Sequence, residues 1–290
     1  MLFLLKKQRK EEERMRKIVT LIILLTAIFT VSACSTDSGF DITSETEIVV
    51  GLEAAYAPFN WATPTENSFT VPIANQSGFY ADGFDVVMAQ EIADALGLTL
   101  VIRAIEWDGL IPALLAGEID LIIAGMSPTS ERAQTVAFSD PYFQSEQVMV
   151  VRNDGDFANA TSLNDFEGAR IVAQLGTLQD DLIDQIPGVN HLDAVNDYAT
   201  LVTSLLNNAS DGFVAELPVA MGIVAANPSL SYITFTDGNG FSVSAEDVTV
   251  SVALRQEDTA LLSAINEALT AISTETRNGY MEAALSRQPQ

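Results

Sequence analysis

Apolar runs alternate with amphipathic stretches along most of the chain, and the alternation begins at Glu47. Short apolar runs bounded by turn residues are typical of buried strands, whereas apolar positions at helical spacing predict helices. The first half is expected to hold strands at 47–52, 98–105 and 119–124 and helices at 85–96 and 109–115. Gly97 and Gly117 end the two helices. This order predicts a largely parallel sheet with helices on both faces.

The same pattern restarts in the second half of the chain. Its expected elements are strands at 147–151, 169–174, 212–215 and 248–254 and helices at 177–185, 197–207, 217–225 and 259–272. Two successive α/β units followed by a strand and a helix predict two lobes, with the last segment returning to the first. We expect one lobe at 47–144 and 247–290 and the other at 145–246, with two chain crossings between them. The polar stretch 59–83 is a long connection on one lobe.

The first 33 residues read as a signal peptide rather than as part of the fold. A short basic region is followed by the apolar run 18–29 and by small residues. The apolar run is too short to span a bilayer comfortably. Because residues 1–14 precede a complete signal, Met15 is a candidate for the true start. Residues 34–46 are polar, without periodicity, and predict a flexible tether.

The charge balance narrows the choice of partners. The chain has 14 Lys and Arg against 39 Asp and Glu, a net charge of -25. From residue 34 onward there are 36 acidic residues and seven basic ones, all of them arginines. Such a surface repels the phosphate backbone, so we expect no nucleic-acid partner.

Seven short motifs carry a family resemblance. They are EAAYAPF at 53–59, GFD at 83–85, WDGLIP at 107–112, AGMSPTSER at 124–132, FSDPY at 138–142, QLGT at 174–177 and AELPV at 215–219. In this order they resemble the polar amino-acid-binding proteins of bacterial ABC importers, which are solute-binding proteins of family 3. The resemblance runs from residue 47 to about 284.

The resemblance implies a two-lobed α/β fold of the type II periplasmic-binding class. It also implies a monomer, without cofactor or metal, that captures a polar L-amino acid between closing lobes. The partners would be the permease and ATPase subunits of an ABC importer. The sequence Val-Ser-Ala-Cys at 31–34 resembles a bacterial lipobox, which implies a lipid on Cys34 and anchoring to the outer face of the cell membrane. An ordinary free thiol is the alternative for Cys34, the chain's only cysteine.

Arg132 is the candidate for binding the ligand's carboxylate. The strand 119–124 ends in a turn, after which Pro128 and Thr129 are expected to begin a helix, with Arg132 about one turn in. A guanidinium binds a carboxylate through two charge-assisted hydrogen bonds. Ser127 and Thr129 add hydroxyl donors. A surface ion pair is the alternative for such an arginine, whereas the resemblance assigns it to the α-carboxylate.

Other candidates come from the second lobe. Gly176 and Thr177 open a predicted helix, whose free N–H groups attract an anion, although an ordinary N-cap fits the same residues. Glu216 follows a predicted strand, where open α/β sheets place ligands. The resemblance assigns it to the α-ammonium group, with help from the Gly125 carbonyl. The family usually has an aspartate there, and a surface glutamate is the alternative.

The remaining candidates surround the ligand's side chain. The resemblance makes Tyr56 and Trp107 the two aromatic rings that enclose it and places Glu53 at its distal end, although aromatic residues near strand ends are often core residues. Cation–π attraction would suit a cationic side chain between the rings. The resemblance also brings Met126 and Gln174 to the site. Two acids against one arginine disfavour aspartate and glutamate, so a neutral or cationic ligand is expected.

Two other functions fit the same fold class. An enzyme, such as a dehydratase or a peptidoglycan lyase, is disfavoured because the only histidine, His191, lies in an expected surface turn. The sequence has no Ser–His pair, no metal-ligand spacing and no glycine-rich phosphate loop. A ligand-sensing receptor subunit would need a separate signalling partner.

Overall fold

The computed structural model describes residues 39–236 and 238–289. The predicted signal peptide and Cys34 lie outside these residues. Of the predicted tether, residues 39–46 are described. There the backbone N–H of Phe40 donates to the Asp258 carboxylate. None of the helices within 39–236 and 238–289 has the length and apolar character needed to cross a membrane.

The first lobe is built on a five-stranded sheet in the order β6-β1-β7-β16-β8. Its strands are β1 (Glu47–Leu52), β6 (Thr99–Ala104), β7 (Leu121–Ile122), β8 (Ala137–Phe138) and β16 (Ala253–Leu254). Strands β6, β1 and β7 are parallel, whereas β16 runs antiparallel to both β7 and β8. Four of the five strands, β6, β1, β7 and β8, therefore run in the same direction, as the prediction of a largely parallel sheet requires. The strand added by the returning chain reverses direction.

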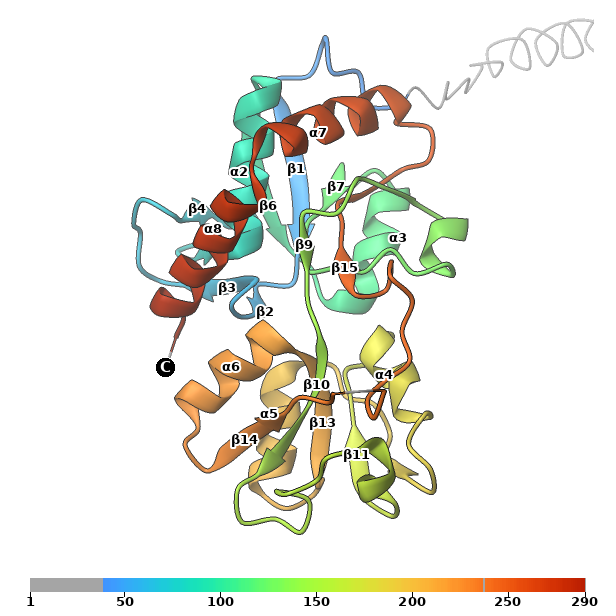
Figure 1. Cartoon of the computed structure of the whole chain (residues 1–290). Helices are drawn as coiled ribbons and strands as arrows, with labels where there is room; N and C mark the ends of the chain where they lie inside the picture. Colours follow the sequence, from blue (N-terminus) through green and yellow to red (C-terminus); the bar gives the residue numbers. More distant parts are fainter. Residues whose placement is uncertain (1–38, 237, 290) are drawn as a thin grey trace, which may run out of the picture. The chain divides into compact units, whose positions relative to one another are not determined.

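Helices cover this first sheet, as Figure 1 shows for α2, α3 and α7. They are α2 (Phe84–Leu96), α3 (Leu110–Leu115), α7 (Thr259–Ala271) and α8 (Thr274–Arg287), with a 3-10 turn η1 (Trp107–Gly109) before α3. Helix α2 ends at Gly97, whose backbone is left-handed with φ of 70°. Ser273 caps α8 by accepting a hydrogen bond from the Thr276 N–H. The sequence pattern missed α8 because few of its side chains are buried: Met281 and Ala284 are the two that its burial pattern shows.

A second, four-stranded sheet has three of its strands in the stretch 59–83 that was expected to be a polar connection. Its order is β2-β3-β5-β4, and every pair is antiparallel. The strands are β2 (Ala55–Tyr56), β3 (Asn60–Thr63), β4 (Val71–Pro72) and β5 (Tyr80–Asp82). Strands of two to four residues are too short to show an alternating pattern, which is why the sequence did not reveal them.

The second lobe contains a mixed sheet in the order β12-β11-β13-β10-β14. The strands are β10 (Gln147–Arg152), β11 (Arg170–Val172), β12 (Asn190–His191), β13 (Gly212–Glu216) and β14 (Leu230–Ile233). The helices are α4 (Leu178–Ile183), α5 (Tyr198–Leu206) and α6 (Leu217–Ala226), with a 3-10 turn η3 (Leu163–Phe166). The predicted α/β class and the two lobes are confirmed.

The chain passes between the lobes twice, through two short paired strands. These are β9 (Phe143–Gln144) and β15 (Thr249–Val250), which run antiparallel. The strand expected at 248–254 is therefore divided into β15 and β16. Between them the Ser251 N–H donates to the Met126 carbonyl at 3.0 Å, outside either strand pairing.

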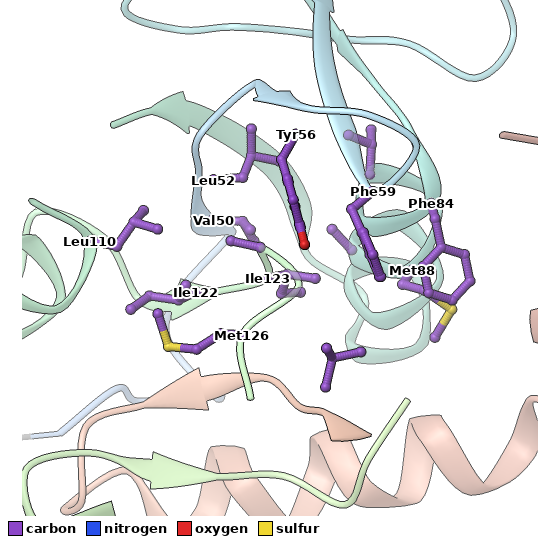
Figure 2. Packing of buried hydrophobic residues seen from close by; sticks show 14 of the residues in the cluster. Val50, Leu52, Tyr56, Phe59, Phe84, Met88, Leu110, Ile122, Ile123 and Met126 are labelled. Carbon is purple, nitrogen blue, oxygen red and sulfur yellow. The ribbon is translucent and has the colours of Figure 1, made fainter. Parts of the chain in front are cut away.

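The main hydrophobic core lies under the connection between β1 and α2. Phe59 and Phe84 are fully buried, and their rings meet edge to face at 6.1 Å. Figure 2 shows them beside Met88, with Val50 of β1 and Ile123, the residue after β7, nearby. Burying such side chains stabilises the fold by about 1.5–3 kcal/mol each. Tyr56 packs on this core through the stacking of its ring on Phe59.

Candidate functional site

One pocket is lined by residues of both lobes. The lining residues are Glu53, Tyr56, Trp107, Gly125, Ser127 and Arg132 from the first lobe and Gln174, Thr177, Leu178, Gln179, Tyr198 and Glu216 from the second. Its volume is about 20 Å³, roughly the space of one water molecule. A ligand as large as an amino acid can therefore enter only if the two lobes move apart.

Nine of the twelve predicted ligand-binding residues line this pocket. The three that do not are Met126, Thr129 and Gly176. Met126 is buried in the hydrophobic core. The hydroxyl oxygen of Thr129 accepts a hydrogen bond from the backbone N–H of Arg132, with 3.4 Å between nitrogen and oxygen. Gly176 contributes its carbonyl group to contacts between the lobes.

Arg132 lies at the pocket, but the predicted helix at Pro128 is wrong. Arg132 instead opens a single 3-10 turn, η2 (Arg132–Gln134). Its guanidinium donates to the Ser127 carbonyl at 2.9 Å and, across the pocket, to the Gly176 carbonyl at 3.2 Å. These bonds use two of the five guanidinium N–H donors, so three remain for an anion. Burial lowers the pKa of Arg132.

Trp107 reinforces the same contact between the lobes. Its indole N–H donates to the Gly176 carbonyl at 3.0 Å. The guanidinium carbon of Arg132 lies 5.1 Å from the centre of its ring, a cation–π distance. Gly176 accepts from both side chains, and its left-handed φ of 70° suits the glycine. The sequence indicated its N–H group as an anion donor, whereas the structure shows its carbonyl in use.

Thr177 is the N-cap of α4. Its hydroxyl donates to the Gln174 carbonyl at 2.7 Å and accepts from the Asp180 N–H at 3.3 Å. Both hydroxyl functions are thus occupied within the second lobe. The role of ordinary N-cap, left open by the sequence, is present in the structure.

Glu216 is the last residue of β13 and the N-cap of α6. Its side chain lines the pocket, although the residue is only 3% exposed. Its Oε2 atom is buried and has no hydrogen-bond partner among the described residues. Burial raises the pKa of Glu216 to about 8. A buried carboxylate without a partner is costly unless a cation is bound against it.

Glu53 is the second carboxylate that lines the pocket. Its Oε1 atom accepts from the Gln174 amide at 2.8 Å, and that amide also donates to the Asn196 carbonyl at 2.8 Å. Burial raises the pKa of Glu53 to about 7, opposed by the Gln174 hydrogen bond. The negative charges of Asp197, Glu106 and Asp108 raise it further. Glu53 therefore lies in a negative electrostatic environment.

Besides Trp107, two tyrosine rings line the pocket, one from each lobe. The Tyr56 ring stacks on Phe59 at 5.3 Å with an angle of 7° between the planes, and Figure 2 shows the two rings side by side. From the second lobe, Tyr198 approaches Tyr56 to 4.9 Å. Tyr198, Leu178 and Gln179 line the pocket without having been predicted. Tyr198 begins α5, and in the sequence it fits the apolar face of that helix, so no local signal marked it.

A buried network beneath the pocket holds its first-lobe turns. The Asp85 carboxylate accepts from the Tyr142 hydroxyl at 2.7 Å and from the Asn60 amide at 2.8 Å. The Tyr142 oxygen accepts from the Gly125 N–H at 3.2 Å, and the Asn60 carbonyl oxygen accepts from the Ala54 N–H at 2.7 Å. Burial raises the pKa of Asp85 to about 6. The network thus ties the turn after β1 to the turn after β7.

Comparison with known proteins places these features in a family. Residues 48–282 match the model of the bacterial extracellular solute-binding proteins, family 3. The chain is 33% identical over 235 residues to a probable histidine-binding protein of Campylobacter jejuni, across 79% of this chain and 85% of that protein. It is 26% identical over 271 residues to the arginine-binding extracellular protein ArtP of Bacillus subtilis, across 92% of this chain and 96% of ArtP.

A solved structure agrees with these matches. An amino acid ABC transporter substrate-binding protein from Streptococcus pneumoniae, bound to L-arginine, is similar with a TM-score of 0.73 and 28% identity. The similarity covers 84% of this chain and 96% of that one.

Proposed function

Because the chain belongs to the bacterial extracellular solute-binding proteins of family 3, we propose that it binds a cationic L-amino acid between its lobes and delivers it to an ABC importer. Family membership confirms the resemblance drawn from the sequence motifs. It also confirms the expectation of an extracytoplasmic binding protein of a transporter rather than an enzyme.

The single observation that carries the choice of ligand class is the buried Oε2 atom of Glu216, which has no hydrogen-bond partner among the described residues, in the same pocket as Arg132. A free α-amino acid offers an ammonium group for the first and a carboxylate for the second. Charge-assisted hydrogen bonds of this kind contribute about 1.5–3 kcal/mol each. Removing the Glu216 carboxylate from solvent without a counterion is costly, so a bound ammonium would relieve that cost.

The environment of Glu53 supports a cationic side chain. Four acids act on this end of the pocket, namely Glu53, Glu106, Asp108 and Asp197. The rings of Tyr56, Trp107 and Tyr198 can enclose a planar guanidinium or an alkyl ammonium. A glutamate ligand would bring a further negative charge to Glu53 and is disfavoured. Relatives named for binding arginine agree with this choice.

Capture would proceed by closure of the lobes. Hydrogen bonds from Gln174 to Glu53, and from Trp107 and Arg132 to Gly176, connect opposite lobes. The pocket of about 20 Å³ must widen to admit the ligand. A ligand that bonds to both lobes would favour the closed arrangement by its differential affinity for it.

We also propose that Cys34 carries the lipid anchor and that the protein works as a monomer. The lipobox-like Val-Ser-Ala-Cys supports the anchor. Mass spectrometry of the protein from its native host should find a lipidated cysteine after cleavage before Cys34. An intact leader would contradict this proposal.

Calorimetry with the twenty amino acids tests the ligand, and L-arginine or L-lysine should bind most tightly. Arg132→Ala should then weaken that binding by well over tenfold, because about 1.4 kcal/mol corresponds to tenfold. Arg103→Ala is the matched control, because Arg103 lies in β6 and does not line the pocket. Tightest binding of glutamate would overturn the cationic assignment, and unchanged binding by Arg132→Ala would overturn the site.

A further inference from the structure

Helix α6 contains a glycine whose position needs an explanation. Gly222 lies buried within α6, where glycine costs a helix about 1 kcal/mol relative to alanine. A Cβ atom at this position would lie 2.5 Å from Oε1 and 2.6 Å from Nε2 of Gln288. Real Cβ atoms do not approach other atoms so closely. The absence of a side chain at Gly222 therefore makes room for the Gln288 amide.

The two residues belong to different lobes. Gly222 is carried by α6, which packs on β14, β10 and β13 of the second lobe. Gln288 is the C-cap of α8, which packs on α2 of the first lobe. Figure 1 shows the end of α8 close to α6. Although it is polar, Gln288 is only 6% exposed.

The end of α8 is held firmly to the first lobe. Arg287 Nε donates to the buried Asp82 carboxylate at 2.9 Å, and its guanidinium lies 4.2 Å from the centre of the Phe69 ring. About two turns earlier in α8, the Tyr280 hydroxyl donates to Glu91 of α2 at 2.7 Å. Gln288 thus has a fixed starting point from which its amide reaches the second lobe.

This contact is separate from the ligand pocket. Neither Gly222 nor Gln288 lines that pocket. Near the other end of α8, Arg277 and Asn278 line a groove of about 570 Å³, which Leu217 and Pro218 at the start of α6 also line. The two helices therefore leave open space near their first turns and meet at Gln288 and Gly222.

We propose that Gln288 and Gly222 are positioning residues for ligand capture, forming a contact that exists only when the lobes are closed. The proposal rests on the proposed capture between lobes. When the lobes separate, the Gln288 amide leaves Gly222 and returns to solvent. The close packing of the Gln288 side chain on the backbone of α6 is lost when the lobes open, so it favours the closed state and increases affinity without touching the ligand.

Two helix glycines allow a matched experiment. Gly222→Ala and Gly279→Ala both add a methyl group inside a helix, with the same gain in helix propensity. At Gly279, which lies in α8, no atom is within 4 Å of the added Cβ, whereas at Gly222 the Gln288 amide must leave. Gln288→Ala removes the amide itself.

Calorimetric titration with L-arginine should give dissociation constants about threefold to tenfold higher for Gln288→Ala and for Gly222→Ala than for the wild type. Gly279→Ala should bind as the wild type does. The double variant Gly222→Ala/Gln288→Ala should bind like Gln288→Ala alone, because the amide that the methyl group displaces is already gone. Wild-type affinity in Gln288→Ala, or equal affinities in Gly222→Ala and Gly279→Ala, would overturn the proposal.

Small-angle X-ray scattering separates this inference from the proposed function. If the wild type binds no amino acid, the proposed function fails. Scattering of the ligand-free proteins then still tests whether the contact between Gln288 and Gly222 holds the lobes closed. Gln288→Ala and Gly222→Ala should then have a larger radius of gyration than the wild type and Gly279→Ala. Four identical radii would overturn the contact.

Discussion

Two buried carboxylates, one below the pocket and one facing it, have opposite surroundings. Asp85 is fully buried, and its two oxygens accept from Tyr142 and Asn60. Glu216 is also buried, but its Oε2 atom has no partner among the described residues. Burial raises the pKa of both carboxyl groups, to about 6 for Asp85 and to about 8 for Glu216. The hydrogen bonds from Tyr142 and Asn60 stabilise the Asp85 anion and limit the rise of its pKa.

This difference in hydrogen-bond partners distinguishes a carboxylate that supports the fold from one that is available to a ligand. The satisfied carboxylate of Asp85 rigidifies the turns that carry Glu53 and Gly125, and it can be understood without a ligand. The Oε2 atom of Glu216 has no such donor among the described residues, and under the proposed function a bound ammonium group would supply its partner. If Glu216 binds the ligand as proposed, its carboxylate should lower the stability of the free protein and increase the affinity for the ligand.

The largest effect is expected from Asp85→Ala. The variant leaves the Tyr142 hydroxyl and the Asn60 amide buried without their acceptor, at about 1–3 kcal/mol for each. We expect urea denaturation to show a loss of about 3 kcal/mol or more in the free energy of unfolding. A loss below about 1 kcal/mol would contradict the scaffold role. Asp94→Ala, at the exposed end of α2, is the control and should have little effect.

Glu216→Gln should move affinity and stability in opposite directions. The amide keeps the size of the side chain but removes the negative charge that would hold the ammonium group. Calorimetry should show affinity for L-arginine reduced by about tenfold or more, the loss of one charge-assisted bond. Thermal unfolding of the ligand-free variant should occur at the wild-type temperature or above it, because no buried carboxylate remains to be desolvated. Glu146→Gln, exposed and outside the pocket, serves as control. A large loss of stability in Glu216→Gln would show that its carboxylate is structural.

The smallest effect is a dependence on pH. The folded-state pKa of Glu216, about 8, lies above its ordinary value of 4.5, so the folded protein retains this proton where the unfolded chain has lost it. The resulting stability is complete below pH 4.5 and is lost as the pH rises through about 8. Between pH 7 and 8 the ligand-free protein should therefore become less stable.

Affinity should change in the opposite sense over the same range. The ligand's ammonium favours the ionised Glu216, so binding releases a proton and strengthens by at most about tenfold between pH 7 and 8. Titration in buffers of different ionisation enthalpy would count the released protons. Glu53, with its pKa raised to about 7, should contribute a smaller part of the proton release and of the change in affinity. An affinity independent of pH in the wild type would contradict both assignments, and Glu216→Gln should retain only the Glu53 share.

Local pattern determined much of this protein from the sequence alone. Strand β1 and helix α2 agree with their predicted bounds to within a residue, because buried strands and amphipathic helices show their periodicity locally. Family motifs then identified nine of the residues that line the pocket. The α/β class and the two lobes followed from the order of the elements.

Only the tertiary structure decided which groups meet across the pocket. Gln174 bonds to Glu53 over a separation of 121 residues, and Tyr198 reaches Tyr56 from the other lobe. The Gly176 carbonyl, the 3-10 turn at Arg132 and the Gln288–Gly222 contact had no local signature either. Periodicity shows which face of an element is buried. It does not show which element covers that face, because this depends on how distant segments pack together.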